Sequence, residues 1–582
     1  MMEKCWVLKP PGDPEKVIGL SKDLGIDQSL TNLLVQRGVT TFDEAKTFFR
    51  PTLSDLYDPF LMKDMDKAIA RITKAIDQKE KILVYGDYDV DGTSAVSLVY
   101  TFLQSFHPEI DFYIPDRYNE GYGISLVGID FAAETNVKLI IALDCGIKAV
   151  EKVAYALTKG IDFIICDHHR PGAEIPPAAA VLDPKQSDCN YPYKELSGCG
   201  IGFKLIQAYT QKNNLPFENL TQYLDLVAIS IASDIVDITG ENRILAYFGL
   251  KLINTRPRPG LEALLRYSAM MKKDDGLGGC VFIRELTITD LVFMIGPRIN
   301  AAGRIESGKN SVRLLITKDL DDAKHVAVQI NAHNTERKAL DTFATQQALG
   351  MIGADEKLKS ARSTVIYHPD WHKGVIGIVA SRLTETYYRP TIVLTLSNGL
   401  ITGSARSVRD FDIYEAVDAC SDLLEHFGGH KFAAGLSLKP ENLEAFRSRF
   451  ESVVQERLQG IELVPIMDAD SLLPLNKINS RFYSILKQFA PFGPGNMAPL
   501  FITKGVMDAG GSRIVGKNHL KLSVVHPDIA GGPFSAIAFQ QGERFGLIEK
   551  QIPFNICYHI EENEWNGSVN LQLNIKDIKF AD

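Results

Sequence analysis

The chain has 582 residues, of which 45% are hydrophobic and 23% charged, as in an ordinary globular protein of three or four domains. This composition excludes a disordered chain, a collagen-like chain and a small disulfide-stapled scaffold. The net charge of −9 argues against a polycation that coats nucleic acid, although it says nothing about local basic patches.

The apolar runs and the cysteines bear on where the protein works. No apolar run approaches the ~18 residues of a membrane span, and the N-terminus has no signal-peptide pattern. The eight cysteines include no C-x-x-C pair, so neither a zinc finger nor a disulfide framework is expected. We therefore expect a cytoplasmic protein with reduced thiols and no membrane partner.

The first half of the chain predicts helices followed by an α/β domain. Amphipathic patterns predict helices in residues 1–78, and we expect this segment to pack on the domain that follows. Short apolar runs at 81–86, 137–144 and 161–167, separated by helical stretches, predict strands buried on both faces of a parallel sheet. This α/β domain is assigned residues 79–310.

The second half predicts a connecting helix and two smaller domains. Residues 311–354 have a helical pattern throughout and predict a long connecting helix that could contain a break. A second α/β domain at 355–458 has predicted strands at 363–369 and 390–396. Residues 459–582 alternate polar and apolar side chains with period two, which predicts a small antiparallel β-barrel.

Carboxylates or histidines follow each predicted strand of the parallel sheet. Three aspartates at spacing two follow the first strand and are expected to point to one side of an extended segment. One aspartate follows the second strand, an Asp-His-His triplet follows the third, and one more aspartate interrupts an apolar stretch. In chain order these residues are Asp87, Asp89, Asp91, Asp144, Asp167, His168, His169 and Asp234. Ligands bind at the carboxyl ends of parallel strands, so we expect the set to converge there.

The convergence of these groups predicts a metal centre. An aspartate after a strand is often only a helix N-cap, but so many carboxylates together repel one another unless cations neutralise them. Oxygen ligands with imidazole suit Mn²⁺ or Mg²⁺, and a pair of such ions is the usual apparatus for in-line attack of water on phosphorus. The residues thus predict phosphoester hydrolysis. Cys145 and Cys166, beside these groups, are expected to be packing residues.

Several motifs carry a family resemblance. GDYDVDGTSA (86–95), ALDCG (142–146), CDHHR (166–170) and SIASDIVD (230–237) resemble the motifs of the DHH phosphoesterase superfamily. Further motifs resemble the RecJ single-strand-specific exonucleases: GPRINAAGRI (296–305), WHKGVIGIVASRL (371–383), FGGHKFAAGL (427–436) and PFGPGN (491–496). The resemblance covers the chain in order. It implies an α/β DHH parallel-sheet domain, a long connecting helix, a smaller α/β DHHA1 domain and a β-barrel OB-fold.

The resemblance assigns roles at the metal centre. The positions that match the family's metal ligands are Asp89, Asp91, Asp144, His168 and Asp234, with Asp87 as a further ligand. His169 matches a second histidine expected to contact the scissile phosphate or a metal-bound water, and the catalytic set is His169, Asp144 and His168. Many relatives have histidine where this chain has Tyr85, so that ligand's role is expected to fall to Asp87.

Basic and polar residues elsewhere are expected to hold the substrate. Arg117 lies in a segment that resembles the one near the 5′ phosphate in the family, and GPRINAAGRI resembles another strand-binding segment. A stretch at 509–526 contains basic residues and no acid, which is typical of a groove for single-stranded nucleic acid. The predicted phosphate- and strand-binding residues are Arg117, Arg298, Asn300, Arg304, Arg406, His430, Arg513, Lys517 and Lys521.

Three further sequence features have competing interpretations. GCGIGFK (198–204) contains G-x-G but follows no clear strand, so a dinucleotide cofactor is not expected. His426 and His430 have zinc-like spacing, but the two glycines between them make a shared helix face improbable, and strand contact or a structural role is expected. Phe489 and Phe492 could stack on bases, although core packing is the favoured role.

The resemblance implies a metal-dependent 5′→3′ exonuclease that releases mononucleotides from single-stranded DNA in repair and recombination. Its expected partners are single-stranded DNA with a 5′ end, a single-strand-binding protein and a helicase, and a monomer is expected. One alternative is a DHH phosphodiesterase acting on dinucleotides or short RNA, against which the residues after 460 argue. Another is a non-catalytic single-strand-binding replication scaffold, against which the intact acidic set argues.

Overall fold

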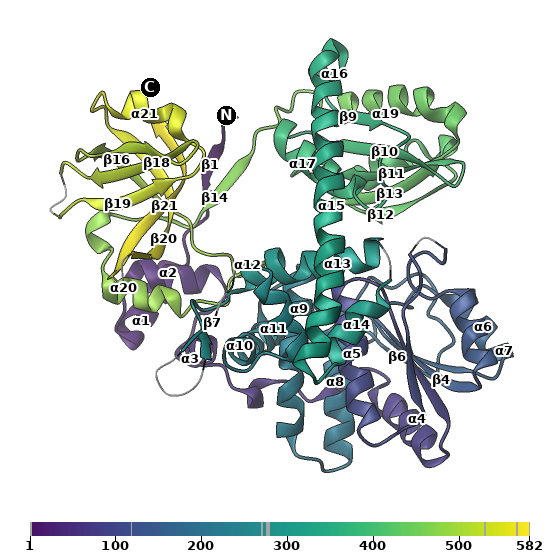
Figure 1. Cartoon of the computed structure of the whole chain (residues 1–582). Helices are drawn as coiled ribbons and strands as arrows, with labels where there is room; N and C mark the ends of the chain where they lie inside the picture. The colour runs from purple at the N-terminus through teal and green to yellow at the C-terminus, as the bar shows by residue number, and fades with distance from the viewer. Residues whose placement is uncertain are drawn as a thin grey trace. The chain divides into compact units, whose positions relative to one another are not determined.

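The computed structural model describes residues 3–117, 119–268, 270, 272–274, 280–305, 307–528, 531–565 and 568–580 (Figure 1). The chain forms two compact units, one made mainly of Val328–Pro465 and the other of Trp6–Gly303, Ser307–Ala327 and Ile466–Asp582. Within the described residues, no helix combines the length and the apolar character needed to cross a membrane.

The larger unit contains a five-stranded parallel sheet in the order β3-β2-β4-β5-β6. The strands are β2 (Lys81–Gly86), β3 (Ile110–Tyr113), β4 (Val137–Leu143), β5 (Asp162–Cys166) and β6 (Ala180–Leu182). The predicted strands at 81–86, 137–144 and 161–167 are confirmed as β2, β4 and β5. The sequence pattern does not single out β3 and β6, which are only four and three residues long.

Helices cover both faces of this sheet, which is why its strands have near-continuous apolar runs. Helices α6 (Leu126–Glu134) and α7 (Val150–Thr158) pack on one face, in a core that includes Leu83, Ile140 and Phe163. On the other face lie α5 (Val90–Gln104) and α8 (Gly198–Lys212), and α9 (Leu224–Ser233) packs against α5. The carboxyl ends of β2, β4 and β5 therefore open between these helix layers.

The smaller unit contains a mixed sheet in the order β12-β13-β11-β10-β9. Its strands are β9 (Thr364–Tyr367), β10 (Thr391–Ser397), β11 (Leu400–Arg406), β12 (His426–His430) and β13 (Ala433–Leu438), with helices α17 (Ile376–Tyr387) and α19 (Leu443–Arg457). The two strands predicted here are confirmed as β9 and β10. The single helix predicted at 311–354 is two helices, α14 (Lys309–Ile316) and α15 (Leu320–Ala354), so the break falls near its start.

The C-terminal strands form a barrel in the order β15-β16-β20-β21-β19-β18-β17, and pairing of β16 with β18 closes it. They are β15 (Ser471–Leu472), β16 (Phe501–Asp508), β17 (Arg513–Val515), β18 (His519–Val525), β19 (Phe534–Ala538), β20 (Phe554–Trp565) and β21 (Ser568–Phe580). Alternate residues of β18 are buried, as its sequence predicts. The barrel is not wholly antiparallel, because β15 pairs with β16, and β19 with β21, in parallel.

The N-terminal segment packs on two domains, whereas the sequence predicts only one of them. Helices α1 (Pro14–Leu24), α2 (Gln28–Gln36) and α3 (Phe42–Phe49) share one hydrophobic core with the barrel. The first strand, β1 (Cys5–Leu8), also pairs with β14 (Ile466–Ala469). On the parallel-sheet domain, α4 (Met65–Asp77) packs against α8 and β6, and the turns at Leu53–Asp55 and Pro59–Leu61 pack against α10 (Gly240–Thr255) and α8. Phe48 of α3 also contacts Arg243 of α10, so the segment lies against both domains, with the apolar faces of α1–α3 mainly on the barrel. The amphipathic pattern shows which face of a helix is buried but not which partner covers it.

Phe489 is a fully buried member of this shared core. Its ring lies 5.4 Å from that of Phe48 and 5.3 Å from that of Phe49, both edge-to-face. Such aromatic pairs add stability beyond the burial of their area. Phe489 is therefore a packing residue, and Phe492 packs against the same core in a partly buried position.

Replacing Phe489 by alanine is expected to lower the free energy of unfolding by about 3–5 kcal/mol, because a large cavity forms between α3 and the barrel. Urea unfolding checks the midpoint, and limited proteolysis checks whether α1–α3 are released. Phe293→Ala is the control, since that ring is 72% exposed, and it should change stability by less than about 0.5 kcal/mol. An unchanged midpoint for Phe489→Ala would contradict the shared core.

Candidate metal centre

The first three aspartates follow a tight strand-to-helix turn. Strand β2 ends at Gly86 and α5 begins at Val90, so Asp89 is the N-cap, and its Oδ1 accepts the N–H of Gly92 at 3.0 Å. Asp91 therefore lies in the first helical turn, and the prediction that Asp87, Asp89 and Asp91 share one extended segment is wrong. Asp89 fits both interpretations of its sequence position, because it caps a helix and also faces the acidic cluster.

Asp91 is held by the N-terminus of α8. Its Oδ2 accepts the N–H of Gly198 at 2.7 Å, and its Oδ1 accepts the N–H of Cys199 and the hydroxyl of Ser230, each at 2.7 Å. Helix N-termini stabilise anions in this way. The glycine-rich motif at 198–204 thus binds a carboxylate of the chain itself. Gly198 is required there, because a Cβ would lie 2.7 Å from the Cβ of Asp144.

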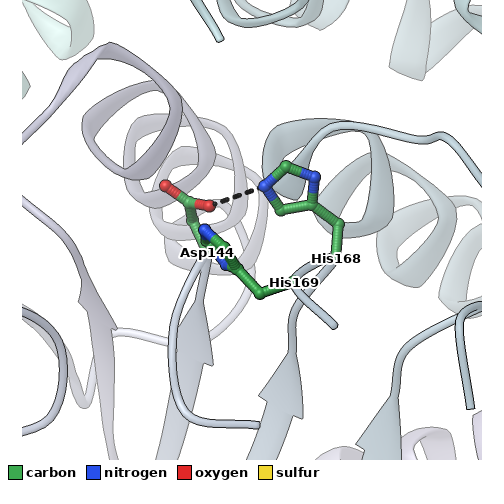
Figure 2. A group of neighbouring side chains, drawn as sticks. All are labelled: Asp144, His168 and His169. Atoms are coloured by element: carbon green, nitrogen blue, oxygen red, sulfur yellow. Dashed lines mark ion pairs between the residues drawn. The ribbon is translucent and has the colours of Figure 1, made fainter. Parts of the chain in front are cut away.

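Four acidic and imidazole groups meet around His168. Its Nε2 lies 3.2 Å from Asp144 Oδ1, 3.4 Å from Asp234 Oδ2 and 3.8 Å from Asp91 Oδ2. Figure 2 shows the imidazole of His168 directed at the carboxylate of Asp144, with His169 beside them. Asp144 follows β4 with φ +59°, His168 follows β5, and Asp234 is the C-cap of α9. The predicted convergence of separate elements is therefore present.

The polar atoms of this cluster fit a divalent cation. Within the described part of the chain, Asp87 Oδ2, Asp144 Oδ1 and both ring nitrogens of His168 are buried without a hydrogen-bond partner. Buried polar atoms are nearly always paired, so these atoms call for a ligand. Asp91, Asp144, His168, His169 and Asp234 place their ligand atoms in two overlapping groups, each within 4.8 Å.

The electrostatics of the cluster agree with that fit. Burial, followed by repulsion from neighbouring aspartates, raises the pKa of Asp87, Asp89 and Asp144, and it raises the pKa of Asp234 to about 8. Burial lowers the pKa of His168, which keeps its imidazole neutral, as a metal ligand must be. Divalent cations would relieve the repulsion between the carboxylates, and oxygen ligands with imidazole suit Mn²⁺ or Mg²⁺.

His169 differs from His168 because Asp167 holds it. The Nδ1 of His169 lies 2.7 Å from Asp167 Oδ1, and Asp167 Oδ2 accepts the N–H of Ile147 at 2.9 Å. Burial acts to lower the pKa of His169, but the hydrogen bond and charge of Asp167 outweigh it and raise that pKa to about 9. Burial likewise acts to raise the pKa of Asp167, but His169 and backbone N–H groups lower it to about 2. The Nε2 of His169, 3.3 Å from the hydroxyl of Tyr122, is thereby aimed away from Asp167.

Tyr85, which is expected to stand in place of a family histidine, points into a loop network. Its hydroxyl donates to the carbonyl of Gly123 at 3.0 Å and accepts the N–H of Ser125 at 3.1 Å, and its ring stacks on Tyr113. Asp87 Oδ1 accepts the N–H of Gly123 at 3.5 Å, while its Oδ2 is one of the orphaned atoms. This placement agrees with Asp87 as a ligand, which stays a prediction.

The residues expected to hold the strand near this centre have different environments. The guanidinium of Arg117 lies 5.1 Å from the ring centroid of Tyr88, and its charge acts on Asp87. Asn300 Oδ1 accepts the N–H of Val90 at 3.2 Å, which caps α5. Arg298 is 7% exposed and donates to the carbonyls of Met294 and Tyr267, which stabilises its own segment. The side chain of Arg304 lies outside the described residues.

The remaining predicted strand-binding residues lie on two sheets. Arg406 of β11 and His430 of β12 both pair with Ala433 of β13, so they flank the same residue. Arg513 and Lys521 are paired across the β17–β18 hairpin, with Lys517 in the turn between these strands. Each pair is thus brought together within its own sheet. His430, Arg513 and Lys517 are exposed, while Arg406 and Lys521 are half-buried.

Four residues of the site carry weaker sequence signals. Ser230 precedes Asp234 by four residues, which places both on one helix face, and that spacing is the signal for it. Tyr122 contacts His169, and Gly198 contacts Asp144, but neither residue type stands out in a sequence. Asp183 is a buried carboxyl directly after β6, a strand too short to be recognised.

Cys145 and Cys166 are buried thiols, and burial raises the pKa of each. These properties are those expected of packing residues.

Replacing Gly198 by alanine is expected to lower the affinity for Mn²⁺ by about 10–100-fold. The new Cβ displaces Asp144 and weakens the backbone hydrogen bonds to Asp91. Isothermal titration calorimetry with Mn²⁺ measures this. Gly200→Ala, in the same turn of α8, is the control, since its Cβ would approach no atom closer than 3.3 Å. Equal affinities for the two variants would show that Gly198 does not shape the centre.

Family models match three segments of the chain. The model described as "DHH family, N-terminal domain" matches residues 81–231, the "DHHA1 domain" matches 360–456, and the "RecJ OB domain" matches 469–577. The parallel sheet, the mixed sheet and the barrel described above occupy these three segments. The α/β fold with a DHH domain, a DHHA1 domain and an OB-fold is therefore confirmed.

Whole-chain relatives agree with these matches. A protein of Bacillus subtilis named single-stranded-DNA-specific exonuclease RecJ is 36% identical over 99% of this chain and 71% of its own length. The Escherichia coli protein of the same name is 32% identical over 94% of this chain and 95% of its own. The crystal structure of RecJ from Thermus thermophilus in complex with Mn²⁺ has a TM-score of 0.83 at 26% identity, covering 99% of this chain and 80% of that one. The chain belongs to the RecJ family of DHH proteins.

Proposed function

We propose that the protein is a metal-dependent exonuclease that hydrolyses single-stranded DNA from the 5′ end to mononucleotides, in DNA repair and recombination. The observation that carries the proposal is the cluster of Asp91, Asp144, His168 and Asp234, with its orphaned buried ligand atoms, in a chain that matches RecJ proteins over nearly its whole length. Relatives named as single-stranded-DNA-specific exonucleases support the substrate.

The metal centre is proposed to hold two Mn²⁺ or Mg²⁺ ions. The proposed ligands are Asp87, Asp89, Asp91, Asp144, His168 and Asp234. Unpartnered buried atoms or clustered ligand atoms support all of them except Asp89, for which burial beside Asp91 is the support. Ions in such a centre polarise phosphate oxygens and acidify water for in-line attack on phosphorus. The structures of RecJ crystallised with Mn²⁺ support the choice of metal.

The residues around the ligands have distinct roles in the proposed reaction. Gly198, Cys199 and Ser230 donate three hydrogen bonds to Asp91, which orient its carboxylate and leave one lone pair, on Oδ2, that could bind an ion. Asp167 holds Nδ1 of His169, which leaves Nε2 to donate a hydrogen bond to an oxygen of the scissile phosphate. This orientation is fixed before substrate binds, which is what makes such a donor effective in the transition state.

The strand is proposed to contact basic and polar residues in four places. Arg117 lies beside the centre, where a guanidinium can donate two hydrogen bonds to a 5′ phosphate. Arg406 and His430 are proposed contacts on the DHHA1 sheet, and Arg513, Lys517 and Lys521 on the barrel. Arg298, Asn300 and Arg304 are proposed to act in the segment that caps α5, with Arg298 and Asn300 supporting it from within.

Four further expectations stay predictions. They are a single-strand-binding protein and a helicase as partners, a monomeric state and a cytoplasmic location.

Asp144→Asn is expected to lower the rate of degradation of 5′-labelled single-stranded DNA with Mn²⁺ by at least about 100-fold, because it removes a charge that the ions need. Gel electrophoresis of the products and omission of the metal measure the effect. Asp188→Asn is the control, since this carboxyl is 65% exposed, pairs with Lys63 and lies outside the proposed ligand set. The proposal fails if single strands are not shortened from the 5′ end or if Asp144→Asn is as active as the parent. Equal rates on a dinucleotide and on a long single strand would favour a dinucleotide phosphodiesterase instead.

The double variant Arg513→Ala with Lys521→Ala is expected to raise KM for long single strands about tenfold without changing kcat. Each lost phosphate contact should also weaken the salt dependence of binding. In a plot of log K against the logarithm of the salt concentration, the slope should become shallower by about one per contact. Steady-state kinetics at several salt concentrations, on a 50-mer and on a trimer, test this. The trimer is the internal control, because it is too short to depend on the barrel. A double variant whose salt slope equals that of the parent would exclude this face as the binding groove.

A further inference from the structure

The motif PFGPGN at 491–496 has no role in the proposed chemistry, yet it lies against the chain just after a metal ligand. We name residues 489–496 the strap and residues 234–239 the Asp234 loop. The N–H of Ile238 donates to the carbonyl of Pro494 at 2.7 Å, which joins the two segments directly. Both segments belong to the same compact unit.

The Asp234 loop has a backbone conformation that needs external support. Ile235, the residue after the ligand, has φ +60°, a left-handed conformation that is rare for a β-branched residue. Its side chain is 67% exposed, so its own burial does not compensate for that strain. Strained backbone of this kind persists only where the surroundings hold it, and it is concentrated at functional sites.

Two sets of contacts hold the Asp234 loop. The hydroxyl of Tyr193 and the amide of Asn242 donate to the carbonyl of Asp237 at 3.1 and 3.0 Å. The strap also packs so closely on the loop that a side chain at either of two glycines would displace it. A Cβ on Gly493 would lie 2.4 Å from Cδ1 of the buried Ile238, and a Cβ on Gly495 would lie 2.8 Å from Cγ2 of Thr239.

The strap is itself anchored by a buried arginine. Arg243 of α10 (Gly240–Thr255) donates to the carbonyls of Phe489 and Ala490 at 2.9 and 3.0 Å, and its guanidinium lies 3.9 Å from the ring centroid of Phe48. The amide of Asn496 donates to the carbonyls of Phe489 and Pro491, and its Oδ1 accepts from Arg37, the C-cap of α2. The strap is thus fixed to the parallel-sheet domain and to the N-terminal helices at once.

From these contacts we infer that the strap, which leads into the barrel, is a positioning element for the metal ligand Asp234. The strap acts through the Asp234 loop and does not touch the ions. Because Asp234 is the C-cap of α9, a shift of residues 235–239 moves its carboxylate relative to His168, which is 3.4 Å away. This inference rests on the proposed metal centre, and it makes the affinity for metal depend on a segment outside the DHH domain.

The test compares two glycines with the same backbone conformation. Gly495 has φ +70° and contacts the Asp234 loop, whereas Gly25 at the C-terminus of α1 has φ +65° and open space around it. Alanine at either position has a similar backbone cost, but only Gly495→Ala pushes on Thr239. Mn²⁺ binding to the full-length protein is measured by isothermal titration calorimetry, with thermal unfolding without metal recorded alongside. Asp234→Asn provides the reference for loss of the ligand itself.

The expected result is a loss of about 10–100-fold in affinity for one Mn²⁺ in Gly495→Ala, the range seen when residues that orient metal ligands are changed. Gly25→Ala should bind Mn²⁺ like the parent, and excess Mn²⁺ should restore the nuclease rate of Gly495→Ala. If Gly495→Ala binds Mn²⁺ as the parent does, the inference is overturned. If it does not fold, Asn496→Ala decides, with a smaller loss expected and an unchanged affinity overturning the inference. A parent chain that binds no Mn²⁺ would instead refute the proposed metal centre.

Discussion

Mutual repulsion among buried carboxylates is the constraint on which the rest of this structure depends. Asp87, Asp91 and Asp144 are almost completely buried, and neighbouring aspartates raise the pKa of Asp87 and Asp144, an arrangement that is costly without cations. The fold offsets part of this cost before any ion binds, because three donors from α8 and α9 bind Asp91. The orphaned atoms of Asp144 and His168 show where that compensation stops and where a ligand is required.

The same constraint explains why the supporting residues come from so many elements. A carboxylate that faces cations on one side needs donors on the other, and a single strand end cannot supply both. Asp91 is therefore oriented by α8 and α9, His169 by Asp167, and the backbone after Asp234 by the strap. Asp91 and Asp234, two of the proposed ligands, and His169 beside them thus each have an outer partner that orients them, as is common at metal sites.

The sequence pattern predicts what depends on local periodicity and on the ends of strands. It yields β2, β4 and β5, the alternation in β18 and the convergence of Asp144, His168 and Asp234, because apolar runs and polar endings are local signals. It does not yield the short strands β3 and β6 or the helical position of Asp91. The sequence pattern also does not identify the barrel as the partner of α1–α3, because an apolar helix face does not indicate which surface covers it. The donors of α8 that bind Asp91 are backbone N–H groups, so the residue types alone do not indicate this interaction.

The shared core of the N-terminal helices and the barrel has a consequence for how the chain is made. Helix α3 ends at Phe49 and the barrel begins at Ser471, so more than four hundred residues separate the two halves of one hydrophobic core. At ~5–20 residues per second, the apolar faces of α1–α3 wait roughly 20–80 s during synthesis for the strands that cover them. Over that interval the parallel-sheet domain can fold as a unit, while the first helices stay exposed to chaperones and proteases.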